Sequence, residues 1–185
     1  MMNEVLEETT DRMGKSQKAF ENEMAKVRTG RASTALIDGV KVDYYGTLTP
    51  LSQMATVSIP ESRLITIKPW DVSVIGQVEK AILKANLGLT PSNDGKLIRI
   101  SIPPLTEERR KEIVKTIAKT CEDYKVAVRN IRRDSNEMLK DLQKDGDISE
   151  DDSFKAQKLV QDSTDMAIKK LDTIFVDKEK EILEV

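Results

Sequence analysis

The 185-residue chain contains no histidine and only one cysteine, Cys121. Histidine is the commonest general base and the commonest metal ligand in proteins. Its absence excludes Cys/His zinc sites and Ser-His or Cys-His nucleophile pairs. A single cysteine also excludes an internal disulfide framework, which favours a cytoplasmic protein. The sequence therefore predicts no metal site, and we expect the chain not to be an enzyme.

Other patterns are missing too. The sequence has neither G-x-x-x-x-G-K-[ST] nor G-x-G-x-x-G, the glycine-rich loops that bind phosphate groups. No apolar run approaches the roughly 20 residues that a membrane helix needs. The acidic start MMNEVLEETTDRM does not resemble a secretory signal. We therefore expect no cofactor and no membrane partner, although an enzyme that uses only carboxylates and lysines stays open as an alternative.

The residues that are present favour long helices with solvated faces. Charged residues make up 34% of the chain and apolar residues 38%, whereas aromatic residues make up only 4%. The apolar share is too high for wholesale disorder. With a formal net charge of -2, the protein as a whole has no field that would attract nucleic acid.

Three segments have the period of amphipathic helices. They cover residues 3–29, residues 106–144 and the stretch from 149 to the C-terminus, and the middle one has a regular heptad seam. Since each stripe must be buried, we infer an antiparallel three-helix bundle made of residues 1–29 and 105–185. The three stripes are Leu6, Thr10, Met13, Gln17, Phe20, Met24 and Val27; Val114, Ile117, Cys121, Tyr124, Val128, Ile131, Ser135, Met138 and Leu142; and Ala156, Val160, Ser163, Ala167, Leu171, Ile174 and Ile182.

Residues 31–103 have a different pattern, that of a small α/β domain. Strand-like runs lie at 40–45, 56–59, 64–68 and 97–102, a helix is expected at 72–87, and 90–95 is a turn cluster. The predicted fold is therefore α+β, with a β/α/β domain inserted between the first two bundle helices. The linkers 28–33 and 103–105 must lie at the same end of the bundle and form a hinge. The predicted hinge residues are Gly30, Arg31, Pro103, Pro104 and Leu105.

A row of cations follows the heptad seam of the 106–144 helix. Lys125, Arg129, Arg132, Asn136 and Lys140 recur every three or four residues, and Arg133 widens the row. Arg129 and Arg132 have no carboxylate three or four positions away, so we expect them to have no partner within the helix. Guanidinium groups suit phosphates, which predicts docking on an RNA or DNA backbone. The alternative is an ordinary solvated helix face.

A second basic cluster flanks the predicted hinge on both sides. Arg28 and Arg31 precede the insert, and Arg109, Arg110 and Lys111 follow it. We interpret this cluster as a second phosphate contact or a hinge anchor, with ordinary linker residues as the alternative.

Two other residues are singled out by their type. Cys121 occupies a seam position, so it is expected to be a buried small hydrophobe. Trp70 follows Pro69 and is predicted to lie in the core or at its rim, with a base-stacking platform as the alternative.

Several long motifs make the chain resemble the bacterial ribosome recycling factor family. The resemblance spans essentially the whole chain in one order. The motifs are RTGRAS at 28–33, DYYGTLTPL at 43–51, EKAILKANLGLTPSNDG at 79–95, PPLTEERRKE at 103–112, VAVRNIRRD at 126–134, GDISEDD at 146–152 and DKE at 177–179.

This resemblance implies an L-shaped protein with a tRNA-like outline that acts without a catalytic centre. It implies binding to the post-termination ribosome through large-subunit rRNA and, with elongation factor G and GTP hydrolysis, splitting of the subunits and release from mRNA. A monomer is expected. The implied rRNA contacts are Arg132, Arg129, Arg133, Arg110, Arg28, Arg31 and Lys125.

One rival function is a protein-binding adaptor that recruits a partner helix through the heptad seam. It predicts self-association or a missing helix, and the three stripes within one chain argue against it.

Overall fold

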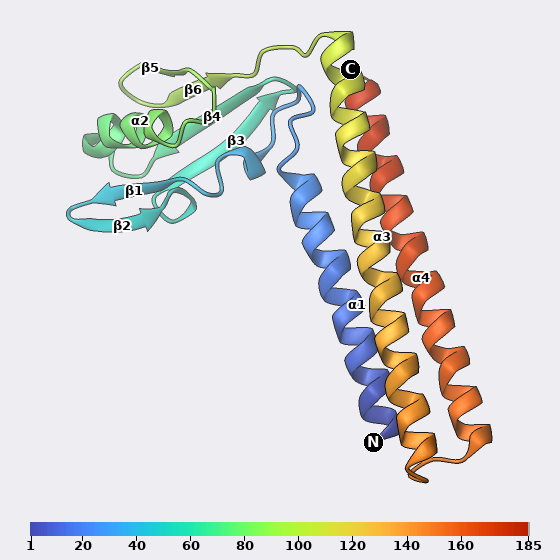
Figure 1. The fold of residues 1–185 in the computed structure, drawn as a ribbon. Coiled ribbons are helices and arrows are strands. Elements are labelled where there is room, and N and C mark those ends of the chain that lie inside the picture. The colour runs from blue at the N-terminus through green and yellow to red at the C-terminus, as the bar shows by residue number, and fades with distance from the viewer. Residues whose placement is uncertain (185) are drawn as a thin grey trace. The chain divides into compact units, whose positions relative to one another are not determined.

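The computed structural model describes residues 1–184, which form two compact units. The bundle unit comprises Met1–Ala25 and Glu108–Glu184, and the insert unit comprises Lys26–Glu107. The chain passes from one helix through an α/β segment to two long helices, which confirms the predicted α+β class (Figure 1).

The bundle unit consists of α1 (Met2–Ala25), α3 (Glu107–Lys144) and α4 (Glu150–Leu183). Figure 1 shows α3 running antiparallel to both α1 and α4. The seam of α3 is buried inside this unit, at Ile117, Cys121 and Val128 for example. The adaptor hypothesis requires a free seam, and these seam positions of the described chain are already covered by its own helices.

The buried faces differ from the predicted stripes at a few positions. Thr9 is buried where Thr10 was predicted, and Leu139 is buried where Met138 was predicted. In α4, Thr164 replaces Ser163 as the buried residue. A straight helix drifts by about 20° per heptad relative to an exact 3.5-residue repeat, so a strict heptad reading goes out of phase along α3.

Small hydroxyl side chains fill several buried positions between the helices. The Thr9 Oγ1 and Ser135 Oγ atoms form a buried hydrogen bond of 2.6 Å that joins α1 to α3. Both hydroxyls also lie within bonding distance of a carbonyl four residues earlier in their own helix, as does that of Thr164. These bonds satisfy polar groups that would otherwise be costly to bury.

Helix α4 begins with a side-chain cap at Ser149. The Asp152 backbone N–H donates to Ser149 Oγ at 3.1 Å, and the Ser149 hydroxyl donates to the Asp152 carboxylate at 2.6 Å. In the usual capping box a glutamate side chain reaches the cap backbone. Here the shorter aspartate contacts the cap hydroxyl instead.

The insert unit contains two antiparallel sheets and one helix. A hairpin is formed by β1 (Lys41–Tyr44) and β2 (Thr47–Pro50). A four-stranded sheet has the order β3-β4-β6-β5. Its strands are β3 (Ala55–Glu61), β4 (Leu64–Pro69), β5 (Pro91–Asn93) and β6 (Ile98–Ser101), and the helix is α2 (Ile75–Lys84).

Two of these strands were missing from the sequence prediction. No strand was expected at β2, and β5 was interpreted as a turn. Both are short and rich in Pro, Ser, Thr or Asn, so neither has the apolar alternation that marks a half-buried strand. They exist because neighbouring strands pair with them.

The core of the insert unit is one continuous apolar cluster. Ile65 and Ile67 of β4 and Ile98 and Ile100 of β6 all point into it and are fully buried. They alternate with exposed or half-buried residues, as expected for a sheet with one buried face. Val78 and Ile82 of α2 close the cluster.

The N-terminal linker is attached to the insert unit. Helix α1 ends at Ala25, four residues before the predicted end, and the Ala32 N–H donates to the Ser62 carbonyl at 2.7 Å. On the other side, the Ile102 N–H donates to the Arg63 carbonyl at 2.8 Å. Both chain connections are therefore hydrogen-bonded to the β3–β4 turn.

Candidate nucleic-acid interface

The cationic row of α3 lies along its border with α4. Lys125 Nζ is 2.5 Å from Asp172 Oδ1 of α4. Two turns further along α3, Arg132 donates from Nη1 to Gln161 Oε1, also on α4, at 3.2 Å. The row therefore follows the junction of two helices, so a ligand that binds it would contact both. Sequence analysis missed these α4 residues because the pattern of one helix does not reveal its neighbour.

Part of the row is neutralised by carboxylates. Arg129 Nη2 is 2.6 Å from Glu122 Oε1, seven residues earlier on the same helix. The prediction that Arg129 has no partner within the helix is therefore wrong: two long side chains on one face span two turns. The Arg129 hydrogen bond, followed by the charges of Lys125 and Arg129, lowers the pKa of Glu122. Its carboxylate therefore stays charged opposite these cations.

The cations with no carboxylate partner lie further along α3. Among residues 1–184, no ion pair involves Arg132, Arg133 or Lys140, and the contact of Arg132 is to a neutral amide. The adjacent carboxylate, Asp134, is 2.8 Å from Arg12 of α1, so it is occupied on the other side of the helix. The positive charge available to a ligand is therefore concentrated at Arg132 and its neighbours.

Asn136 continues the row between these cations. Its side-chain Oδ1 atom is buried and has no hydrogen-bond partner within the described residues. An unsatisfied buried acceptor is uncommon in native structures.

The residues of the second basic cluster differ from one another in burial and in their contacts. The Arg28 guanidinium lies over Gly88: a Cβ added to Gly88 would stand 3.1 Å from Arg28 Nη1. Arg109 pairs with Glu112 at 2.8 Å, whereas Arg110 is half-buried and Arg31 is exposed. Arg28 thus packs within the insert unit, which favours an anchoring role for this residue.

The predicted hinge residues form a close pair of segments within the insert unit. Gly30 has a φ of +79°, and a Cβ placed on it would stand 3.5 Å from Leu105 Cγ. The two linkers therefore run side by side at this point. Pro103 and Pro104 precede Leu105 and cannot donate backbone hydrogen bonds.

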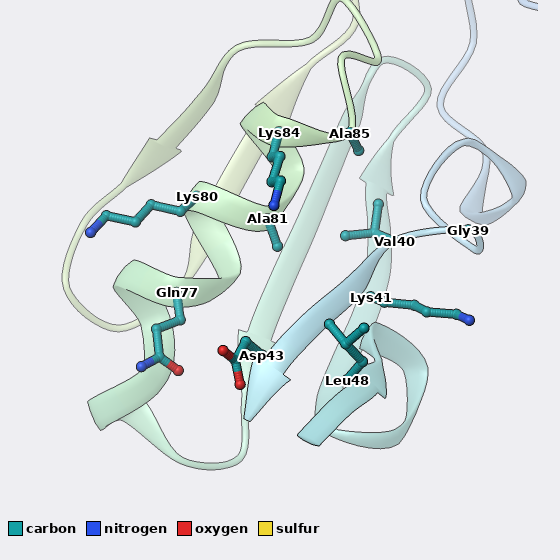
Figure 2. Close-up of a pocket in the computed structure, with 10 residues that line it drawn as sticks. All are labelled: Gly39, Val40, Lys41, Asp43, Leu48, Gln77, Lys80, Ala81, Lys84 and Ala85. Carbon is teal, nitrogen blue, oxygen red and sulfur yellow. The ribbon is translucent and has the colours of Figure 1, made fainter. Parts of the chain in front are cut away.

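A groove of about 450 Å³ lies between α2 and β1 in the insert unit, and Figure 2 shows the residues that line it. Lys84 points into it, and Val40, Ala81 and Leu48 supply apolar surface. Its one carboxylate, Asp43, accepts the Gly46 N–H at 2.8 Å. The groove therefore lacks the pair of acids on which a carboxylate-dependent reaction depends.

Cys121 is buried as predicted, and burial raises the pKa of its thiol. Trp70 is not in the core: 69% of its surface is exposed, and its indole N–H donates to Thr56 Oγ1 at 3.1 Å. Nothing in the sequence around Trp70 distinguishes an inward from an outward ring at the end of a strand.

Fold and sequence comparisons agree on one class of protein, an α+β translation factor with a helical bundle and a small inserted domain. The family profile described as "Ribosome recycling factor" matches residues 20–183. Ribosome-recycling factors from Desulforapulum autotrophicum and Bacillus velezensis are 69% and 54% identical to this chain, and each alignment covers all of both chains. The chain belongs to the ribosome recycling factor family.

Solved structures support the same assignment. A solution structure of a ribosome recycling factor has a TM-score of 0.83 and 40% identity, and the match covers 100% of this chain and 98% of that one. A second structure shows the T. thermophilus ribosome recycling factor and E. coli elongation factor G bound to the E. coli post-termination complex. Its matching chain has a TM-score of 0.68 and 44% identity, with 99% of each chain covered. No helix among residues 1–184 is long and apolar enough to cross a lipid bilayer.

Proposed function

We propose that this protein binds the post-termination ribosome in the cytoplasm through large-subunit rRNA. With elongation factor G and GTP hydrolysis, it promotes dissociation of the subunits and release from mRNA. It contributes binding and force transmission and leaves the chemistry to the GTPase. The observation that carries this proposal is the full-length match to recycling factors, one of which is known bound to a post-termination complex with elongation factor G.

The α3–α4 border supplies the proposed rRNA contact. Arg132 and Arg133 present guanidinium groups that no carboxylate neutralises in the described chain, and such groups bind phosphate oxygens in a two-pronged geometry. Lys125 and Arg129 are held by Asp172 and Glu122, so we assign them a supporting role at the edge of the contact. Arg28, Arg31 and Arg110 are proposed as further contacts near the linkers.

The proposed mechanism uses the linkers 28–33 and 103–105 as a hinge. In this mechanism rRNA holds the bundle while the partner GTPase displaces the insert, and the helices transmit the force to the contacts between subunits. The hinge residues are Gly30, Arg31, Pro103, Pro104 and Leu105. Glycine at a positive φ and two consecutive prolines give these linkers a defined path without regular secondary structure.

The function is tested by a subunit-dissociation assay. Purified post-termination complexes are mixed with this protein, elongation factor G and GTP, and the subunits are separated on a sucrose gradient. We expect dissociation only when all three are present. Intact ribosomes in the complete mixture, under conditions where a recycling factor of established activity splits them, would contradict the proposal.

The hinge is tested separately with a disulfide engineered to tie linker 28–33 to linker 103–105. The reduced form of the same variant is the matched control, and buried Cys121 remains in both. We expect the oxidised form to bind ribosomes normally and to split them poorly. Equal splitting by the oxidised and reduced forms would rule out the hinge mechanism and leave ribosome binding untouched.

A further inference from the structure

One face of the four-stranded sheet in the insert unit is solvated and has a distinctive composition. The apolar side chains of β4 and β6 point into the core, so the alternate residues form the outer face. A cross-strand row passes over all four strands through Ser58, Thr66, Arg99 and Ser92. Beside it, Thr56 pairs with Lys68. The middle of this outer face thus consists of hydroxyls and cations.

Trp70 lies at the edge of this outer face. It follows the last residue of β4, and its indole N–H bonds to the Thr56 hydroxyl at 3.1 Å. This bond fixes a large aromatic ring against the polar face of the sheet, although 69% of the residue stays exposed. Trp70 is one of three strongly exposed rings among the described residues, with Tyr45 and Phe154, and its bond to Thr56 holds it beside the hydroxyls and cations of this face.

The charge of the sheet has the opposite sign to that of the chain. In the strands and turns of residues 55–69 and 91–101 there are four cations, against the two carboxylates Glu61 and Asp94. Asp94 pairs with Arg99 at 3.5 Å, and Glu61 lies beyond the β-bulge at the end of β3 away from Trp70. No ion pair involves Lys68 within residues 1–184, so its charge is available beside the ring.

We infer that the outer face of this sheet binds a short stretch of single-stranded RNA, with a base stacked on Trp70 and a phosphate against Lys68. Hydroxyls of the cross-strand row would bond to sugar and phosphate oxygens. Antiparallel sheets that carry an exposed aromatic ring and basic side chains are a recurring platform for unpaired bases. A protein partner is disfavoured, since protein interfaces have an apolar centre and the middle of this face is polar.

This site is distinct from the α3–α4 border: it lies in the other unit, and it contacts bases as well as backbone. It therefore does not depend on the proposed rRNA contact.

The test uses the intrinsic fluorescence of Trp70, which is the only tryptophan in the chain. The full-length protein is titrated with a six-nucleotide oligoadenylate, with a duplex RNA of matched length and with inorganic polyphosphate. Stacking on a base quenches indole emission, whereas charge alone does not bring a base to the ring. We expect saturable quenching by the single strand only.

Paired variants locate the site. Lys68→Gln and Lys41→Gln remove the same charge from the same unit, but Lys41 lies in β1 beside the groove of Figure 2. We expect Lys68→Gln to weaken quenching at a given RNA concentration, and Lys41→Gln to leave it unchanged. With a labelled oligonucleotide, Trp70→Ala should reduce affinity at least about fivefold, and Trp70→Phe should restore most of it.

Several results would overturn the inference. They are the absence of quenching by single-stranded RNA, equal quenching by duplex or polyphosphate, and equal effects of Lys68→Gln and Lys41→Gln. Emission that changes with elongation factor G but not with RNA would also overturn it and would assign this face to a protein. Thermal unfolding of each variant verifies that the insert unit is folded, and none of these readouts involves ribosome splitting.

Discussion

The insert unit and the bundle unit bury different kinds of side chain. The insert core is one apolar cluster in which isoleucines of β4 and β6 pack against α2. In the bundle, large side chains such as Phe20 and Leu171 alternate with small or hydroxyl-bearing residues such as Thr9 and Ala167. The small residues let long helices approach closely along their length. One unit therefore relies on dense packing, and the other combines packing with specific polar contacts.

Their surfaces differ in the same sense. The bundle carries ion pairs between and along its helices, such as Arg12 with Asp134 and Lys125 with Asp172. Strongly exposed rings occur in both units: Tyr45 at 76% and Trp70 at 69% in the insert, and Phe154 at 74% in the bundle. The charged α3–α4 border is suited to a phosphate backbone, whereas the sheet beside Trp70 is suited to recognition of individual groups.

The largest expected effect comes from truncating each core. Ile67→Ala in the insert and Leu171→Ala in the bundle each leave a cavity and should cost about 2–5 kcal/mol of unfolding free energy. Chemical denaturation followed by Trp70 emission reports the insert, and helical circular dichroism reports mainly the bundle. We expect Ile67→Ala to shift mainly the first signal and Leu171→Ala mainly the second. Identical shifts of both signals in both variants would show that the two units unfold as one.

A smaller effect is expected at the polar contact between α1 and α3. Thr9→Val and Ser135→Ala should each cost about 1 kcal/mol of unfolding free energy, because each removes the buried hydrogen bond between the two helices and leaves the remaining hydroxyl only the carbonyl of its own helix. The double variant should cost less than the sum by roughly 0.5 kcal/mol or more, since both partners are then apolar. A strictly additive double-mutant cycle would mean that the 2.6 Å bond contributes nothing to stability.

Replacing the linker residue Gly30 should lower the unfolding free energy by a similar amount, but through backbone strain and not through a lost hydrogen bond. Gly30→Ala has room for its Cβ, but a φ of +79° strains any residue other than glycine by about 1 kcal/mol. Gly39→Ala is the matched control, because its φ is not positive and its Cβ meets nothing within 4 Å. The denaturation midpoint of the insert should fall for the first variant only. An equal response of both variants would exclude backbone strain as the cause.

The smallest effect concerns the Lys125–Asp172 ion pair. The hydrogen bond to Asp172 raises the pKa of Lys125 despite partial burial, so charged Lys125 stabilises the folded state. This contribution is complete below the ordinary lysine pKa of about 10.4 and is lost as pH rises through the raised value. Asp172→Asn should therefore cost under about 1 kcal/mol at neutral pH, and its difference from wild type should disappear in strong alkali. A difference that grows with pH would contradict this assignment.

Regular periodicity made the bundle predictable. Residues such as Ile117, Cys121 and Val128 recur at helical spacing over many turns, so both the helix and its buried face follow from the sequence. The prediction failed where helical drift accumulates, at Leu139 against Met138. The insert was less predictable, since β2 and β5 are short and lack apolar alternation, and they become strands only by pairing with the adjacent strands β1 and β6.

The charge balance of the candidate site could not be predicted, because it depends on residues that are neighbours in space but not in the sequence. The cationic row was visible as spacing, but its charge balance depends on Glu122 two turns away and Asp172 on another helix. Sequence spacing therefore identified the row without showing that Arg132 and Arg133, rather than Lys125 and Arg129, are its members without a carboxylate partner.

The docking of the α3–α4 border on rRNA is tested most directly by co-sedimentation with bacterial ribosomes over a salt series. Wild type is compared with Arg132→Ala and with Lys18→Ala, which removes one cation that is paired with Glu21 on α1. Arg132→Ala should weaken binding by roughly 1–3 kcal/mol and flatten the log–log salt dependence by about 0.7–0.9, while Lys18→Ala behaves as wild type. Indistinguishable salt curves for wild type and Arg132→Ala would contradict the proposed interface and leave the row as a solvated helix face.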